Sequence, residues 1–379
     1  MRNRRQPRKT LRKVIITLFI GMALAAGGAA AYAGYLYTKA NDALDKMAGS
    51  QPSAGAEEKA DDSRKWRPMT FLLTGIDSRE GSGGTMNMDV MMLAALNPET
   101  HKMTVVSLPR DMLLKSKHHG RHKANYFFPY FYNQDKNTAL QETKRFFSDM
   151  LEVPIDYMAV IDFDGFSRTV DELGGLKLDV DMDMKYTDHA DGTDINLRKG
   201  LQELDGKQTL DFVRYRKSNE GTGESSDLER NTRQQQVIKG LLDKLTSLGG
   251  ISKWGGVLDI AGESVQTDIP AQELKQWILS FKKLKPEQIQ FEHPGGIWDS
   301  PYLLMHQNEL EDALRAYRAE LGLPAESSST GDLSKAVGVS GMSTGSDEPE
   351  GENGGASSGA GEDNGSGRGT DSEKSGRRS

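Results

Sequence analysis

The first apolar stretch of the chain is long and carries no charge. It runs from Val14 to Tyr37 and follows residues 1–13, which hold seven basic residues and no acidic one. At about 1.5 Å per residue it can cross a hydrocarbon core of about 30 Å with some tilt. It predicts a transmembrane anchor over residues 14–37, with a cytoplasmic basic segment before it and an extracellular chain after it. A cleaved signal peptide is the alternative, because Ala31-Tyr32-Ala33 resembles a processing site.

Beyond the anchor, apolar spacing divides the chain into three parts. Residues 38–66 are polar without periodicity and predict a stalk linker. Residues 67–323, with a core at 68–245, alternate strand-like and helix-like runs. They predict an extracellular α/β domain, a three-layer α-β-α sandwich with a central mixed twisted sheet. Residues 324–379 are mostly Ser, Gly, Glu and Asp without an aromatic residue, and predict a disordered tail.

The spacing of apolar residues, together with residues typical of helix and strand ends, predicts where the elements of this domain lie. Strands are predicted around residues 71–73, 90–96, 103–108, 157–163, 176–180 and 289–292, and helices over residues 138–151, 164–173, 205–216, 229–248, 271–284 and 308–321. Between them, residues 118–132 are basic and aromatic without a clear period, and residues 179–194 are expected to form an acidic loop.

Charged side chains flank the first two predicted strands. Asp77 and Arg79 follow the first strand, and Asp89 opens the second. Neighbouring strands can hold Asp77 and Asp89 face to face at one sheet edge. Two carboxylates there suit a hard divalent cation, and Arg79 beside them suits a phosphate.

More arginines stand at the ends of other predicted elements. They are Arg110, Arg214, Arg216 and Arg230, and Gln234 shares a helix face with the last of them. So many cations in one place need an anion, and the planar guanidinium matches phosphate oxygens two at a time, which favours a pyrophosphate. Alternatively, Arg214 and Arg216 have only a structural role: they lie on a solvent-exposed helix face and form ion pairs with nearby glutamates.

Composition narrows the function classes. The formal net charge is −7, and because residues 1–13 are basic the remainder is acidic, so a general nucleic-acid-binding surface is not expected. No cysteine is present, so no disulfide is possible. His118, His119 and His122 have no carboxylate or cysteine partner at metal-ligand spacing and are expected in a polar loop rather than a zinc site.

Several short motifs occur in a characteristic order. They are Gly75-x-Asp77-Ser78-Arg79, Asp89, Ser107-x-Pro109-Arg110-Asp111, Asn125, Asp162-x-x-Gly165-Phe166, Val170-Asp171-x-x-Gly174-Gly175, Arg214-x-Arg216 and Asp227-x-x-Arg230-x-x-Arg233-Gln234-Gln235. This order resembles the LytR-CpsA-Psr family of cell-wall glycopolymer ligases over about residues 68–245. Family members commonly carry an arginine where this chain has Asn87, so one phosphate contact is expected to be weaker or the metal to be held differently.

The resemblance implies an enzyme at the outer face of the cell membrane of a Gram-positive-type bacterium. Such a phosphotransferase moves an anionic glycopolymer, of the teichoic acid or capsule type, from undecaprenyl pyrophosphate to peptidoglycan. The bond formed is a phosphodiester, usually on the 6-hydroxyl of N-acetylmuramic acid. The lipid would lie in an apolar tunnel between sheet and helices.

The resemblance also implies a role for each matching residue. Asp77 and Asp89 are expected to bind Mg²⁺. Contacts with the pyrophosphate are expected from Arg79, Arg110, Arg214, Arg216, Arg230 and Gln234, oriented by Asp227. Catalysis is expected at Arg110, Asp111 and Asp227, where either aspartate can accept the proton of the sugar hydroxyl.

Two other functions stay open at this point. A polyprenyl-pyrophosphate phosphatase would use the same site and hand the phosphate to water. A non-catalytic wall-binding or regulatory protein would suit the stalk and the tail, although no helix-turn-helix is found and DNA contact is not expected.

Overall fold

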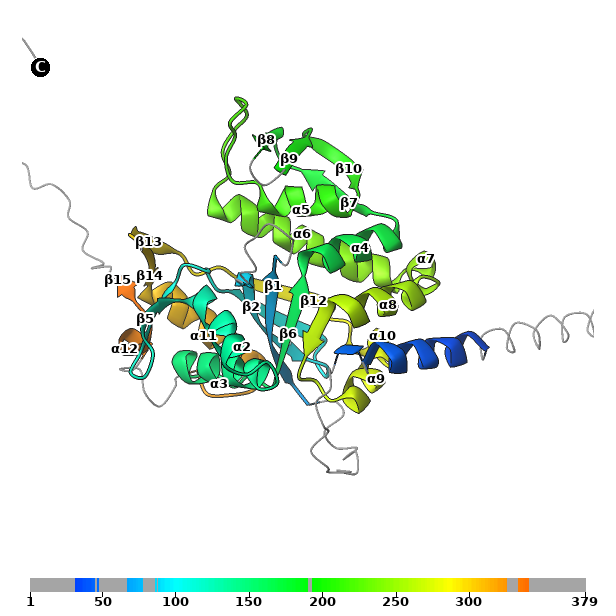
Figure 1. The fold of residues 1–379 in the computed structure, drawn as a ribbon, viewed down its shortest axis with the longest axis horizontal. Coiled ribbons are helices and arrows are strands. Elements are labelled where there is room, and N and C mark those ends of the chain that lie inside the picture. The colour runs from blue at the N-terminus through cyan, green and yellow to red at the C-terminus, as the bar shows by residue number, and fades with distance from the viewer. Residues whose placement is uncertain are drawn as a thin grey trace, which may run out of the picture. The chain divides into compact units, whose positions relative to one another are not determined.

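A mixed sheet lies at the centre of the structure (Figure 1). The computed structural model describes residues 31–44, 46–47, 67–77, 86, 88–189, 193–325 and 333–340. The largest sheet in these residues has the strand order β11-β6-β1-β2-β3-β12. Its strands are β1 (Met69–Ile76), β2 (Met88–Asn97), β3 (Lys102–Ser107), β6 (Tyr157–Asp162), β11 (Val265–Thr267) and β12 (Gln288–Glu292). β1 is parallel to β6, and β3 to β12, whereas β2 is antiparallel to both neighbours, so the predicted mixed sheet is confirmed.

Helices cover both faces of this sheet (Figure 1). One face packs on α2 (Phe127–Gln134), α3 (Ala139–Leu151) and α11 (Gln307–Glu320), and the other on α6 (Asp227–Thr246) and α9 (Ala271–Leu279). Successive residues of a strand point to opposite faces, so Leu72 joins the first layer and Phe71 the second. Burying one such side chain contributes about 1.5–3 kcal/mol, which explains why neither face is left to solvent.

A second group of strands packs against the α6 side of the molecule. It contains β7 (Leu176–Val180), β8 (Met184–Asp188), β9 (Thr193–Leu197) and β10 (Gly200–Leu204), together with α4 (Phe163–Leu173) and α5 (Gly206–Arg214). β7 pairs with β10, and β8 pairs with β9. The predicted acidic loop over residues 179–194 is therefore wrong. Buried Met184 and Ile195 face the core, and the acidic residues between apolar positions concealed the hairpin.

Local signals set the ends of the helices on this side. The hydroxyl of Ser226 accepts from the Glu229 backbone N–H, and the Glu229 carboxylate accepts from the Ser226 N–H. This capping box begins α6 two residues before the predicted start. The helix predicted over residues 271–284 is interrupted at Ser280, so α9 is followed by a short α10 (Phe281–Leu284).

The chain before the sheet contributes a further helix over residues 31–44. Ala40 packs in an apolar cluster with α8 (Trp254–Ser264), and Lys39 Nζ lies 2.7 Å from Asp259 on that helix. The predicted stalk is therefore wrong at its start, because apolar residues at helical spacing recur there among polar ones.

The predicted anchor over residues 14–37 overlaps this helix only at residues 31–37, and its remainder lies outside the described residues. Within the described ranges, no helix combines the length and the apolar character that crossing a membrane requires.

Part of the predicted tail is also folded. The elements concerned are α12 (Leu333–Ala336) and β15 (Val339–Ser340), which pack near β4 (Leu113–Ser116), β5 (Gly120–Lys123), β13 (Gly296–Asp299) and β14 (Tyr302–His306). β15 extends the β13–β14 hairpin, and Val337 is fully buried. The prediction of disorder is wrong for residues 333–340, because a few apolar residues there are outnumbered by Ser, Gly and acids across the whole segment.

Candidate functional site

The ends of the central strands bring the two predicted metal ligands to one sheet edge. Asp77 follows the last residue of β1, and Asp89 is the second residue of β2. Gly75 pairs with Val90, whereas the next residue of β1 pairs with Met88. Asp89 is therefore the extra residue of a β-bulge, a device that re-aims a side chain at a strand end.

Each of these carboxylates is paired with an arginine from another element. Asp77 Oδ2 lies 3.0 Å from Arg214 Nη2, and Asp89 Oδ1 lies 2.8 Å from Arg110 Nη1. Arg214 is the last residue of α5, and its guanidinium also lies 5.0 Å from the ring centre of Phe163. Residues far apart in the sequence thus meet at this edge.

Arg110 links this pair to a second acidic residue. It follows β3, and its Nε lies 3.4 Å from Asp111 Oδ2, whose other oxygen accepts a 2.7 Å hydrogen bond from Lys123. Burial would lower the pKa of Arg110, but the hydrogen bond and charge of Asp89, with the charge of Asp111, outweigh it and raise the pKa. Arg110 therefore stays charged while it is held between two carboxylates.

The pKa of Arg230, in the first turns of α6, shifts in the opposite direction to that of Arg110. Burial, followed by the positive charges of Arg216, Arg110 and Arg233, lowers the pKa of Arg230 to about 10. The charges of Arg216 and Arg110 act on Arg230, and the Ser225 N–H just before α6 donates a 2.7 Å hydrogen bond to the Arg216 carbonyl oxygen. We therefore group Arg110, Arg216 and Arg230 as the arginine cluster. The cluster remains cationic at neutral pH and is suited to an anion.

One turn further along α6, Gln234 contributes a buried amide. Its Oε1 has no hydrogen-bond partner within the described chain, a condition that costs about 1–3 kcal/mol unless a ligand or water relieves it. The neighbouring Gln235 lies with its Nε2 3.0 Å from His293 Nε2, and burial lowers the pKa of His293. Sequence reasoning missed His293, which carries no motif signal and is placed only by the strand β12 that precedes it.

Some expected site residues are placed differently or cannot be described. Arg79 and Asn87 lie outside the described residues, as does the side chain of Asp227, the first residue of α6. Arg233 belongs to the interior: it is 1% exposed and binds both Asp181 oxygens at 2.7 and 2.6 Å. It therefore ties α6 to the β7–β8 connection.

The carboxylates fit a divalent cation that is shared with a ligand. Mg²⁺ commonly takes one or two protein carboxylates and completes its octahedron with phosphate oxygens and water. The described residues contain no cluster of three or more His, Cys, Asp or Glu side chains suited to a metal. Asp77 and Asp89 would suit such a shared arrangement, with Arg214 and Arg110 next to them.

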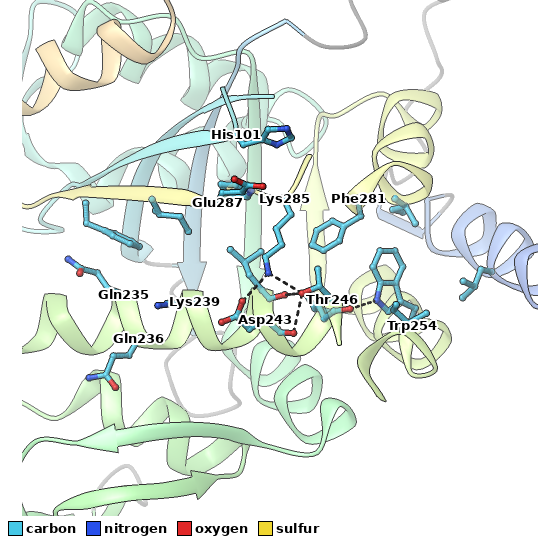
Figure 2. A pocket seen from close by; sticks show the side chains of 18 of the residues that line it. His101, Gln235, Gln236, Lys239, Asp243, Thr246, Trp254, Phe281, Lys285 and Glu287 are labelled. Atoms are coloured by element: carbon cyan, nitrogen blue, oxygen red, sulfur yellow. Dashed lines mark hydrogen bonds and ion pairs between the residues drawn. The ribbon is translucent and has the colours of Figure 1, made fainter. Parts of the chain in front are cut away.

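An apolar cavity of about 1120 Å³ is lined by residues of α6, β12 and the N-terminal helix, among others (Figure 2). Its wall includes Leu242, Trp254, Ile278, Phe281, Ile289 and Phe291, with Ala33 and Leu36 from the N-terminal helix. A cavity for a small metabolite usually measures about 300–1,000 Å³, so this one has room for a larger apolar group. Polar side chains also line it, and two of them, Lys285 and Asp243, form a 2.9 Å ion pair with each other.

Helix α6 connects the cavity with the arginine cluster. Gln235, Lys239, Leu242 and Thr246 line the cavity at helical spacing, while Arg230 stands on the turn before them. β12 runs along the same cavity from Ile289 to Phe291 and, being parallel to β3, ends at the edge that carries Arg110. A molecule with a charged head and a long apolar chain matches this arrangement.

The fold and site define an α/β protein whose sheet edge presents arginines and two aspartates, and whose helix α6 also lines a large apolar cavity. The LytR_cpsA_psr family profile matches residues 31–316, and the chain belongs to the LytR-CpsA-Psr family.

Relatives agree with this assignment. Over 344 residues the chain is 28% identical to the polyisoprenyl-teichoic acid–peptidoglycan teichoic acid transferase TagT of Bacillus subtilis, covering 85% of this chain and 100% of TagT. TagU of the same organism, which bears the same description, is 30% identical over 71% of this chain and 81% of its own. The crystal structure of B. subtilis TagV superposes with a TM-score of 0.52 and 26% identity, over 68% of this chain and 99% of TagV.

Proposed function

We propose that this protein is a phosphotransferase that moves an anionic glycopolymer from a polyprenyl pyrophosphate to peptidoglycan. The transferase descriptions of TagT and TagU support this reaction class. One structural observation carries the proposal furthest: helix α6 carries Arg230 of the arginine cluster and, further along, part of the wall of an apolar cavity of about 1120 Å³. A pyrophosphate suits the cluster, and an isoprenoid chain suits the cavity.

The reaction exchanges one P–O bond for another. The hydroxyl oxygen of the acceptor sugar attacks the phosphorus that carries the glycopolymer, and the bond from this phosphorus to the bridging oxygen breaks. Polyprenyl monophosphate leaves, and a phosphodiester joins the glycopolymer to the 6-hydroxyl of N-acetylmuramic acid. Such a reaction needs positioning and neutralisation of the phosphate charge more than covalent help from the protein.

The residues of the site divide this task. Guanidinium groups of the cluster, with Arg79 and Arg214, bind the phosphate oxygens, and Gln234 adds a polar contact. Mg²⁺ held by Asp77 and Asp89 would neutralise phosphate charge further. The proton of the attacking hydroxyl goes to Asp111, which Lys123 orients at 2.7 Å, or to Asp227.

The substrates determine where the protein works. A polyprenyl donor resides in a membrane and peptidoglycan lies outside it, so we place the anchor predicted over residues 14–37 in the cytoplasmic membrane as a single pass. Residues 31–37, which pack on α8, then lie at its outer end. The N-terminus is then cytoplasmic and the catalytic domain extracellular, as the basic residues 1–13 also suggest.

A reconstituted reaction tests the proposal. The full-length protein in detergent receives a polyprenyl-pyrophosphate-linked glycopolymer, peptidoglycan and Mg²⁺, and the products are resolved by chromatography. Phosphodiester-linked product and polyprenyl monophosphate are expected, with Arg110→Ala slowing transfer by about 10²–10³-fold. Arg145→Ala is the control, because Arg145 on α3 is 71% exposed and pairs only within its helix, with Glu142, among the described residues.

Three other results of this reaction would contradict the proposal. Transfer by Arg110→Ala at the wild-type rate overturns the site assignment. Release of free glycopolymer phosphate in the presence of peptidoglycan identifies a phosphatase, and an unconsumed donor identifies a non-catalytic protein.

A further inference from the structure

The β13–β14 hairpin exposes large apolar side chains close to the candidate site. Ile297 and Trp298 on β13 are 50% and 56% exposed. Burial of such side chains is strongly favourable, so a tryptophan that stays exposed on a structured hairpin marks a contact surface. The role of this surface does not follow from the pyrophosphate site or the apolar cavity, since neither contains these residues.

Strand pairing places Trp298 near Asp111. Trp298 is the cross-strand partner of Leu303, whose backbone N–H donates a 2.8 Å hydrogen bond to the Asp111 carbonyl oxygen. Two strand spacings therefore separate Trp298 from the Asp111 backbone, a distance of about 10 Å. That distance is about the length of two joined sugar rings.

Side chains next to Trp298 also link it to Asp111. Lys123 Nζ lies 5.7 Å from the centre of the Trp298 ring and 2.7 Å from Asp111 Oδ1. Arg121 lies 5.8 Å from the ring centre of Tyr302 in the facing strand β14. An exposed aromatic ring with cations beside it thus continues into the network of Asp111 and Arg110 (Figure 1 shows β13, β14 and β5 together).

We propose that Trp298 is a stacking platform for a pyranose ring of the acceptor glycan. The C–H face of a sugar is apolar and slightly positive, and it packs on the electron-rich face of an indole. Lys123 and Arg121 complement the carboxylates of peptidoglycan by charge and can donate hydrogen bonds to its hydroxyl groups. A strand that binds one sugar on Trp298 presents the next sugar to Asp111 and the arginines. The inference rests on the proposed function, whose acceptor side it specifies.

Binding to a defined glycan tests the platform without any turnover. The full-length protein in detergent is titrated by calorimetry with a tetrasaccharide of alternating N-acetylglucosamine and N-acetylmuramic acid. Trp298→Ala is expected to weaken binding by about 10-fold, as loss of one stacking contact does, while Trp298→Phe keeps it within about 3-fold. Leu201→Ala is the control, because Leu201 is 63% exposed on β10.

Kinetics supply the second readout. In the reconstituted reaction, Trp298→Ala is expected to raise the KM for the glycan by about 10-fold and leave kcat and the KM for the lipid donor within about 2-fold. Unchanged glycan affinity and KM in Trp298→Ala overturn the platform and leave the proposed function standing. Glycan binding that requires Trp298 in a protein that transfers nothing supports the platform and overturns the phosphotransferase. A wild-type protein that does not bind the glycan refutes the platform.

Discussion

Replacing Arg230 with methionine tests the claim that the arginine cluster is built for an anion. Arg230 is half-buried, and burial together with the positive charges of Arg216, Arg110 and Arg233 lowers its pKa to about 10. A neutral side chain of similar length removes this repulsion. We therefore expect Arg230→Met to make the protein more stable in the absence of an anion while it weakens the site, a trade-off known from functional sites.

The pKa gives the size of the effect. A fall of this size below the ordinary arginine pKa corresponds to about 3 kcal/mol. Solvent reaches part of the side chain, so screening reduces this to about 1–2 kcal/mol. Because the folded-state pKa is the lower one, the cost is present in full below pH 10 and disappears as the pH rises from about 10 to the unfolded value. At neutral pH the variant should melt about 3–6 °C above wild type.

Thermal denaturation with and without inorganic pyrophosphate measures both halves of the prediction. Without the anion, Arg230→Met should melt higher than wild type. Pyrophosphate should raise the melting temperature of wild type more than that of the variant, because binding stabilises only the state that binds. Arg315→Met is the control, since Arg315 is 51% exposed on α11 and should shift stability by less than about 0.5 kcal/mol.

Two results would refute the reasoning. An Arg230→Met protein that is less stable than wild type without anion would show that Arg230 supports the fold rather than strains it. Equal stabilisation of both proteins by pyrophosphate would show that the anion binds elsewhere.

Three further changes probe other parts of the molecule. Arg233→Met removes the interior partner of Asp181 and is expected to lower the free energy of unfolding by about 2–4 kcal/mol in urea denaturation, whereas an unchanged midpoint contradicts its structural role. Asp77→Asn should shift a Mg²⁺ titration of transfer to at least about 10-fold higher concentration, and an unshifted titration would remove Asp77 from the metal site. Leu242→Trp overfills the cavity and should slow transfer from a long polyprenyl donor by about 10-fold but not from a short-chain analogue, so equal losses with both donors would tell against lipid binding there.

The fold was predictable where the apolar period was long and unbroken. The helix expected over residues 138–151 is α3 (Ala139–Leu151), and the strand expected over residues 157–163 is β6 (Tyr157–Asp162). The short strands β7 and β12 were also predicted, whereas β8, β9 and β15 were missed. β8 and β9 bury only alternate residues among acids, and β15 comprises two residues that pair only because β14 lies beside them.

The site was predictable as a list of residues but not as a set of contacts. Asp77 and Asp89 could be placed at one sheet edge, because the strands that carry them are neighbours. Arg233 shows the limit. It stands in the same motif as Arg230 and only three residues further along α6, yet it is 1% exposed and binds Asp181, which only the tertiary packing of the β7–β8 connection brings to it.

The amino-acid sequence by itself determined the class of fold, the family and the kinds of side chain available for chemistry, since apolar period and motif order are local properties. The tertiary structure alone decided which arginines meet, that α6 joins the cationic cluster to an apolar cavity, and that Trp298 lies near Asp111. These facts depend on strand register and helix packing between segments that are far apart along the chain. No local pattern encodes them, because they result from burying the whole apolar surface at once.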